Sequence, residues 1–149
     1  MLLPEMVRIL EKQRLGFVAT VSADGKPNLS PKGTFVAIDN TTVAFGEIRS
    51  PNTLVNLKLS AFVEINFVDP LSRKGFRAGG TAAAYAVNTE GYLKYISLFY
   101  RWPTLSPRIR HIVVISIDEA SYLTSPVYDD GASESELRKQ WTHTLLSDG

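Results

Sequence analysis

The residues best suited to chemistry lie in the segment Arg-Ser-Pro-Asn-Thr at positions 49–53, together with Lys32. A guanidinium presents a planar fork of donors that matches phosphate oxygens, and the hydroxyls of Ser50 and Thr53 can donate to the same oxygens. Pro51 favours the start of a short helix with Ser50 as its cap, and a helix N-terminus offers free N–H groups and a positive dipole end. The segment therefore predicts a site for a phosphate monoester.

The same segment also has an ordinary structural interpretation. Ser-Pro-x-Thr is a common way to begin a helix, and an exposed arginine before such a cap is usually solvated. The neighbouring segments 33–35 (Gly-Thr-Phe) and 45–47 (Phe-Gly-Glu) favour binding, because their small and aromatic residues let backbone groups reach the edge of a flat ring. Lys32 adds a second positive charge to the site if its strand lies beside the strand that ends at Ile48.

Other kinds of site find little support in the sequence. His111 and His143 are the only histidines, and neither has metal-ligand spacing, so we interpret both as structural or surface residues and expect no metal site. The acidic residues at 129–131 lack the spacing of a calcium loop. No Gly-x-Ser-x-Gly elbow is present, and the absence of cysteine excludes thiolate chemistry. No side chain is assigned a catalytic role.

The elements that must position these residues follow from the hydrophobic periodicity. Helical spacing predicts helices at residues 3–10, after Ser50, between residues 88 and 102, and from a capping box at Ser133 to Leu146. Alternation of apolar residues predicts six strands, at about residues 15–22, 27–38, 42–48, 61–68, 74–87 and 112–118. We predict a mainly β fold, a six-stranded and mostly antiparallel barrel with peripheral helices.

Length and composition limit the classes of function. A chain of 149 residues suits one domain over residues 1–149, with a core at about 5–120 and a C-terminal loop and helix at 121–149. Sixteen basic residues face 15 acidic ones, so we expect no nucleic-acid partner. No apolar run reaches about 18 residues, which argues against a membrane partner. The lack of cysteine fits a cytoplasmic location.

The order of several motifs resembles that of a known family. Residues 30–34 (Ser-Pro-Lys-Gly-Thr) followed by residues 49–56 are the specific part, within a likeness that covers about residues 5–120. The chain resembles the FMN-binding split-barrel proteins related to pyridoxamine 5′-phosphate oxidase. The resemblance implies a split barrel that forms a homodimer, with FMN at the subunit interface. It also implies a set of cofactor-binding residues: Lys32, Gly33, Thr34, Phe45, Gly46, Arg49, Ser50, Thr53 and Asn56.

The likeness has limits that bear on function. Oxidases that make pyridoxal phosphate share a Ser-Arg-Lys triplet where this chain has Pro51-Asn52-Thr53, and their C-terminal Arg and His have no match in residues 121–149. We therefore expect an FMN-dependent oxidoreductase that acts on another small molecule or electron donor. The alternatives are a non-catalytic flavin-binding or haem-binding sensor, and an interaction domain with an empty site. A deazaflavin in place of FMN also stays open.

Overall fold

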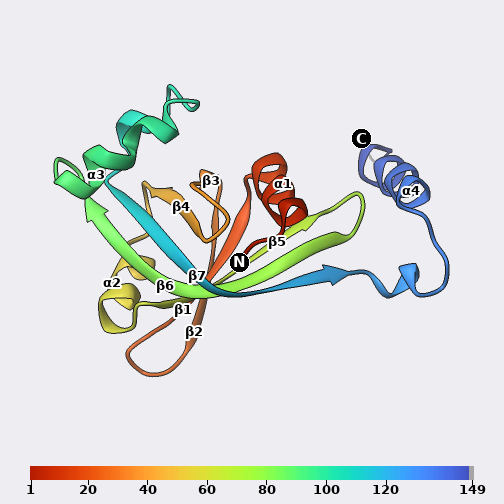
Figure 1. Cartoon of the computed structure of the whole chain (residues 1–149), viewed down its shortest axis with the longest axis horizontal. Coiled ribbons are helices and arrows are strands. Elements are labelled where there is room, and N and C mark those ends of the chain that lie inside the picture. The colour runs from red at the N-terminus through yellow and green to blue at the C-terminus, as the bar shows by residue number, and fades with distance from the viewer. Residues whose placement is uncertain (148–149) are drawn as a thin grey trace.

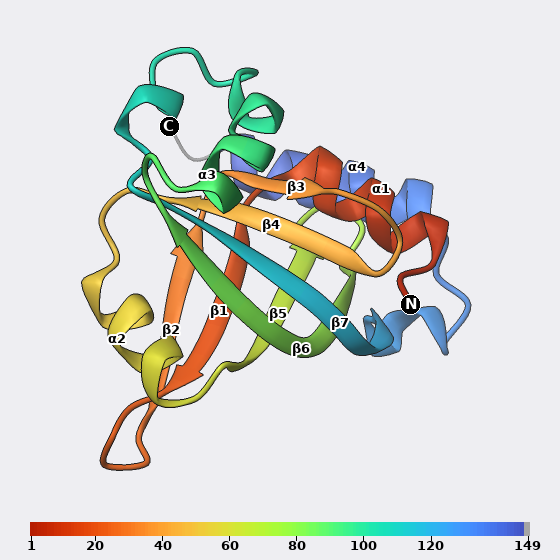
Figure 2. The same ribbon diagram turned by 60° about the vertical axis from the view of Figure 1, so that its left-hand side comes forward.

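A seven-stranded antiparallel sheet, curled into an open barrel, forms the body of the molecule (Figures 1 and 2). The structure is a computed structural model, and residues 1–147 of it are described. The strands are β1 (Gly16–Val21), β2 (Pro27–Lys32), β3 (Phe35–Ala37), β4 (Thr42–Glu47), β5 (Phe62–Asp69), β6 (Lys74–Ala86) and β7 (His111–Thr124). The helices are α1 (Pro4–Gln13), α2 (Pro51–Leu59), α3 (Glu90–Tyr95) and α4 (Glu134–Leu146), with short 3-10 turns η1 (Ile96–Phe99), η2 (Ser106–Arg108) and η3 (Pro126–Tyr128).

The strand order, β2-β1-β5-β6-β7-β4-β3, explains why the sheet must close on itself. Strands β2 and β3 lie at its two edges, yet only residues 33 and 34 connect them. Three Cα steps separate Lys32 from Phe35, and a chain of that length reaches at most about 11 Å. The two edges therefore meet, which gives the sheet its barrel shape.

The predicted fold class is confirmed, with seven strands in place of six. Residues 27–38, predicted as one kinked strand, form two, because β2 pairs with β1 while β3 pairs with β4. Gly33 and Thr34 leave the ladder between them as the chain crosses from one edge to the other.

Strands β6 and β7 form a long antiparallel pair that extends beyond the barrel (Figure 1). Their register runs from Lys74 opposite Thr124 to Ala86 opposite His111, with an irregularity between Gly79 and Gly80. Strand β7 continues past its predicted end at residue 118, because the first half of β6 pairs with residues 119–124. Residues 121–124 thus belong to the sheet and not to the C-terminal tail.

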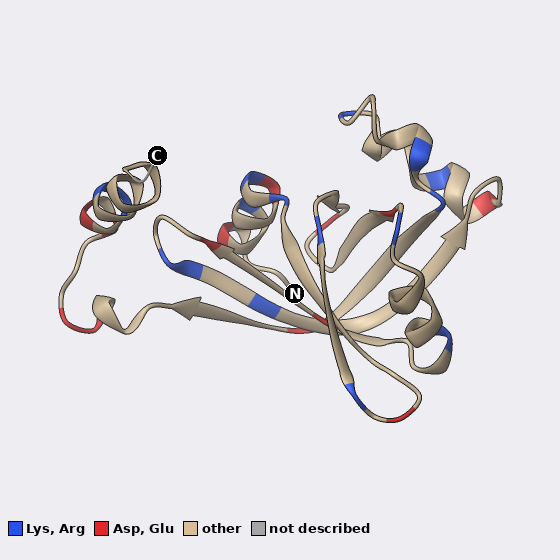
Figure 3. Ribbon diagram, turned by 180° about the vertical axis from the view of Figure 1, so that it is seen from behind, with Lys and Arg blue, Asp and Glu red and all other residues tan. Residues whose placement is uncertain are grey.

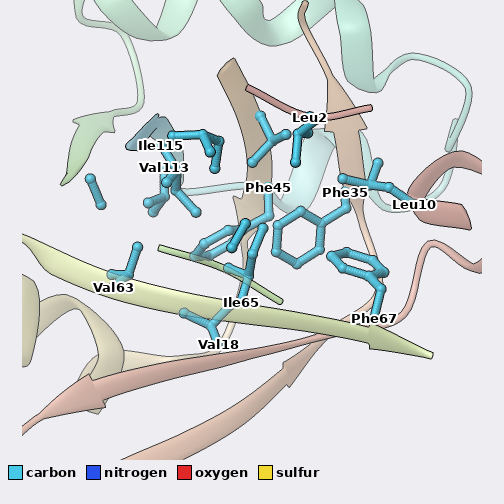
Figure 4. Packing of buried hydrophobic residues seen from close by; sticks show 14 of the residues in the cluster. Leu2, Leu10, Val18, Phe35, Phe45, Val63, Ile65, Phe67, Val113 and Ile115 are labelled. Atoms are coloured by element: carbon cyan, nitrogen blue, oxygen red, sulfur yellow. The ribbon is translucent and has the colours of Figure 1, made fainter. Parts of the chain in front are cut away.

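Four phenylalanines form the centre of the barrel, and Figure 4 shows three of them side by side. The rings of Phe35 and Phe67 meet edge to face at 4.8 Å, Phe45 lies 5.2 Å from Phe35, and Phe76 stacks on Phe67 at 5.3 Å. All four side chains are fully buried. Aromatic pairs in this geometry stabilise a core beyond the area that they bury, so the cluster fixes how the strands pack.

The terminal helices cover the barrel in different ways. Helix α1 buries Met6 and Leu10 in the core. Helix α4 begins at the predicted capping box and contacts the molecule through its first turns, with Leu137 buried and Trp141 under the guanidinium of Arg73. Leu145, near the end of the helix, is exposed. The helix expected over residues 88–102 is shorter and forms as α3 followed by η1, with Thr89 as its cap.

Charged residues are scattered over the molecule and do not gather on one face (Figure 3). Any anion must therefore be held by a local group of side chains. Within residues 1–147, none of the helices is both long and apolar enough to span a membrane. The cytoplasmic location stays a prediction.

Two adjacent glycines test the close approach of β6 to β7. A Cβ at Gly80 would lie 2.0 Å from the carbonyl oxygen of Ser116, whereas a Cβ at Gly79 would meet its nearest atom at 3.5 Å. We expect Gly80→Ala to lower the free energy of unfolding by about 1–3 kcal/mol, because backbone must move to admit the methyl group. Gly79→Ala is the matched control and should change it by less than about 0.5 kcal/mol. Urea denaturation measures both, and equal stabilities would contradict the described register.

Candidate functional site

The amine of Lys32 lies at the centre of the predicted site, at the end of β2. Its Nζ donates to Ser30 Oγ at 2.5 Å, to Ser50 Oγ at 2.6 Å and to Thr53 Oγ1 at 3.4 Å. Ser30 belongs to the same strand, whereas Ser50 and Thr53 belong to the start of α2. Closure of the barrel brings these elements together, because β2 and the end of β4 meet where the sheet edges meet.

This lysine is unusual in being buried without a carboxylate as hydrogen-bond partner. Its residue is 5% exposed, and its described hydrogen-bond partners are three neutral hydroxyls. Burial lowers the pKa of Lys32 below its usual range, and the negative charge of Glu47 opposes only part of that shift. A buried cation solvated by hydroxyls favours the arrival of an anion nearby, since an anion would stabilise the charged form of the amine.

A shallow hollow of about 180 Å³ lies over these hydroxyls. Arg49 is exposed at its edge, and the first turn of α2 forms one wall. The N–H groups of Asn52 and Thr53 have no acceptor within the helix, as in any first helical turn. The hollow thus collects a guanidinium, hydroxyls and N–H groups, all of them donors to a phosphate. Its lining residues are Asn28, Leu29, Ser30, Arg49, Ser50, Pro51, Asn52 and Thr53.

Three of the predicted cofactor-binding side chains are engaged inside the protein. Thr34 Oγ1 donates to the carbonyl oxygen of Gly46 at 3.0 Å and accepts from its N–H at 3.1 Å, which joins the segment before β3 to β4. Phe45 packs in the core, and Asn56 donates to Thr20 Oγ1 at 3.0 Å. Their contact with a cofactor stays a prediction, and each has a structural role that the sequence did not reveal.

The two predicted glycines differ from each other. A Cβ at Gly33 would meet no atom within 4 Å, so the backbone there is open to an approaching group. A Cβ at Gly46 would lie 2.5 Å from Ile109 Cδ1. Packing against Ile109 is therefore sufficient to explain the glycine at position 46.

Sequence reasoning missed the residue that holds the loop before α2. Glu47 is fully buried and accepts three hydrogen bonds: from Ser50 N–H at 2.7 Å, from Arg110 Nη2 at 2.9 Å and from His111 Nδ1 at 3.0 Å. Burial by itself would raise the pKa of Glu47, yet these donors lower it below its usual value of 4.5. The only available signal was an acidic residue at the end of an apolar strand, which is usually read as a solvated loop.

The described residues offer donors for an anion and no evident metal site. Within residues 1–147, no group of three or more His, Asp or Glu side chains is placed to hold a metal ion. The donors of the cluster around Lys32 suit an anionic group.

The hydrogen bonds of Glu47 give a pH-dependent prediction. Because the folded state lowers the pKa of Glu47, its contribution to stability is complete above pH 4.5 and is lost as the pH falls through the folded value. We expect Glu47→Gln to lower the free energy of unfolding at pH 7 by about 1–3 kcal/mol, since an amide presents a donor where the carboxylate accepts. The difference from the unsubstituted protein should shrink below about pH 4.

Glu64→Gln is the matched control for this measurement. Glu64 pairs with Arg77 at 3.1 Å, but both side chains are more than half exposed. Its loss should change stability by less than about 1 kcal/mol at any pH. Chemical denaturation at a series of pH values compares the two variants. Equal losses of stability would show that the hydrogen bonds of Glu47 contribute no more than an exposed ion pair does.

Comparisons with known proteins agree with this fold. The structure is similar to that of HupZ from Group A Streptococcus, with a TM-score of 0.71 and 28% identity over 84% of this chain and 96% of that one. It is also similar to an FMN-binding protein from Syntrophomonas wolfei subsp. wolfei, with a TM-score of 0.63 and 16% identity over 81% and 90% of the two chains. It is also similar to an F420 reductase, with a TM-score of 0.60 and 21% identity over 76% of this chain and 94% of that one. A comparison with curated proteins gave no match.

The family model for pyridoxamine 5′-phosphate oxidase matches residues 2–123. This range contains α1, nearly all of the sheet, and every residue of the cluster around Lys32 and Glu47. The chain belongs to the pyridoxamine 5′-phosphate oxidase family.

Proposed function

We propose that this protein binds FMN and works as an FMN-dependent oxidoreductase on a small molecule other than pyridoxamine phosphate. The observation that carries the proposal is the buried Lys32 amine, which has hydroxyl partners and no bonded carboxylate, behind a hollow edged by Arg49. Lys32 and Arg49 together supply two positive charges. That number matches a phosphate monoester, which carries close to two negative charges at neutral pH.

The proposed roles of the residues follow from their positions. Arg49 gives the phosphate a pair of N–H donors, and Ser50 and Thr53 give hydroxyls that Lys32 orients from behind. Glu47 fixes the loop by holding the N–H of Ser50. FMN would supply hydride or electron transfer through its ring, and the protein would supply orientation and exclusion of water.

Relatives support the choice of a flavin-type cofactor. One similar structure is of an FMN-binding protein and another is of an F420 reductase. Both cofactors are flat rings that bear a phosphate, so both suit a donor cluster beside an open backbone at Gly33. We favour FMN because its phosphate is a monoester, whose two negative charges match the positive charges of Lys32 and Arg49. A cytoplasmic location is part of the proposal.

The proposal includes a homodimer with the cofactor between its subunits. The outer surface of β1 and β5 exposes large apolar side chains, which are Phe17, Val21, Phe62 and Val68, with Glu64 and Asn66 between them on β5. Apolar side chains gathered on one sheet face are typical of an interface. A partner on this face would lie next to the C-terminal end of α2, because Phe62 begins the strand that follows this helix.

The first test compares FMN with riboflavin, which lacks the phosphate. We expect the protein to prefer FMN, and Arg49→Ala to weaken FMN binding by about thirtyfold to a thousandfold, since it removes a charge-assisted pair worth roughly 2–4 kcal/mol. Lys32→Met should weaken FMN binding as well, and neither change should alter riboflavin binding. Quenching of flavin fluorescence measures all of these affinities.

Lys26→Ala is the control for loss of charge. Lys26 is an exposed lysine whose only described ion pair is with Asp24, at 3.3 Å, so its removal should leave FMN affinity unchanged. Equal effects of Lys26→Ala and Lys32→Met would place the phosphate elsewhere.

With FMN bound, NADH or NADPH should bleach the flavin faster than it bleaches free FMN. Binding without faster bleaching would support a flavin-binding sensor in place of an oxidoreductase.

The second test concerns the dimer. Phe62→Glu places a charge on the proposed interface, where burying it without a partner is costly, and we expect the protein to become monomeric. Sedimentation velocity measures the change. Leu93→Glu is the matched control, because Leu93 on α3 is 63% exposed and Phe62 is 62% exposed. A dimer that survives Phe62→Glu, or one that Leu93→Glu disrupts instead, would move the interface to another face.

A further inference from the structure

A second hollow, of about 570 Å³, lies between α2 and the place where the end of β6 pairs with the start of β7. It shares Pro51 with the hollow over the Lys32 cluster but is otherwise lined by different residues. Its floor is a stripe of three alanines on β6 (Ala82, Ala84 and Ala86), whose small side chains leave a flat surface. Leu54 and Val55 of α2 form an apolar wall. A hollow of this size suits a small molecule, and its floor suits a flat one.

The polar groups of this hollow are all basic. Lys58 and Arg110 lie at its edge beside His111, and none of its lining residues is acidic. The nearby carboxylate of Glu47 is fully buried behind them and is occupied by its three donors. Charge complementarity therefore favours an anion, while the alanine floor favours an apolar body.

His111 presents a defined nitrogen to this hollow. Its Nδ1 lies 3.0 Å from Glu47 Oε2, and a carboxylate in that position keeps a proton on Nδ1. Its Nε2 is then the nitrogen left for a ligand, and the side chain is partly exposed where it lines the hollow.

We propose that the hollow between α2 and β6 binds a small planar anion, of the class of aromatic carboxylates and sulfonates that also carry an N–H or O–H group, with His111 Nε2 accepting a hydrogen bond from that group. The aromatic body lies on Ala82, Ala84 and Ala86, and its charge faces Lys58 and Arg110. This site is distinct from the proposed phosphate site, because Pro51 is the one lining residue that the two hollows share and none of the residues proposed to contact the phosphate lines it.

A fluorescent probe tests the site directly. 8-Anilinonaphthalene-1-sulfonate is a planar aromatic anion that brightens in apolar surroundings, and it is titrated into the full chain at pH 7. Ala84→Leu fills the floor and should weaken binding about tenfold or more. Ala83→Leu is the matched control, because successive residues of a strand point to opposite faces and Ala83 does not line the hollow. It should leave the affinity unchanged.

Two substitutions at position 111 separate the roles of the imidazole nitrogens. His111→Asn keeps a donor near the position of Nδ1 and removes Nε2, whereas His111→Gln places an amide near Nε2, and the oxygen of that amide can accept a hydrogen bond. We expect His111→Asn to weaken probe binding about tenfold and His111→Gln to weaken it less. Urea denaturation of each variant checks that folding is retained.

Three outcomes would overturn the proposal. Equal probe affinity of Ala84→Leu and Ala83→Leu would place the probe elsewhere on the molecule. Unchanged affinity in His111→Asn would remove the imidazole from the site. A shift of the monomer–dimer equilibrium by Ala84→Leu, without an effect on the probe, would show that a second copy of the chain covers this face.

Discussion

Closure of the sheet by a two-residue connection is the constraint on which the rest of the structure depends. Strands β2 and β3 belong to opposite edges, and Gly33 and Thr34 are too few to let those edges separate. Thr34 then fastens the junction through two hydrogen bonds to Gly46. Because of this junction the end of β2 lies beside the start of α2. Lys32 consequently meets Ser50 and Thr53, from which it is far removed in sequence.

The same junction keeps a buried acid and a buried base near each other without joining them. Glu47 holds the N–H of Ser50, and Lys32 holds the hydroxyl of the same serine. The carboxylate is occupied by Arg110 and His111, so it does not neutralise the lysine. Ser50 thus separates two electrostatic environments, one basic and open to an anion, the other satisfied internally. An ion pair between Glu47 and Lys32 would have left neither available for binding.

Local patterns predicted most of the fold. Alternation located the strands, and the capping box at Ser133 located the start of α4. The failures came from long-range pairing: β7 extends to Thr124 because β6 offers it partners, and residues 27–38 divide because their two halves pair with different strands. No local pattern reports such pairing, since it is set by tertiary contacts.

The candidate site was predicted in part for a similar reason. The segment at 49–53 is contiguous, so residue types alone pointed to an anion, and the structure shows how closely the predicted Lys32 approaches it, through hydrogen bonds to Ser50 and Thr53. The hydrogen bond between Glu47 and His111 was missed, because the two residues are 64 positions apart in sequence and no local pattern reports their contact. The side chains of Phe45 and Asn56 could not be assigned from sequence, since whether a side chain faces a ligand or the core depends on how the strands curl.

The attachment of α4 has a consequence for the mechanics of the chain. Arg138 bonds to the nearly buried Asp69 at 2.6 Å, whereas Glu134 bonds to Lys74 at 3.1 Å in a more exposed position. Dissolved ions screen the exposed bond more strongly than the shielded one. At high ionic strength the contribution of the Glu134–Lys74 pair would fall, while the bond to Asp69, the buried Leu137 and the contact of Trp141 with Arg73 would still hold the first turns of the helix. Salt would therefore weaken one electrostatic attachment of α4 and leave its apolar attachment intact.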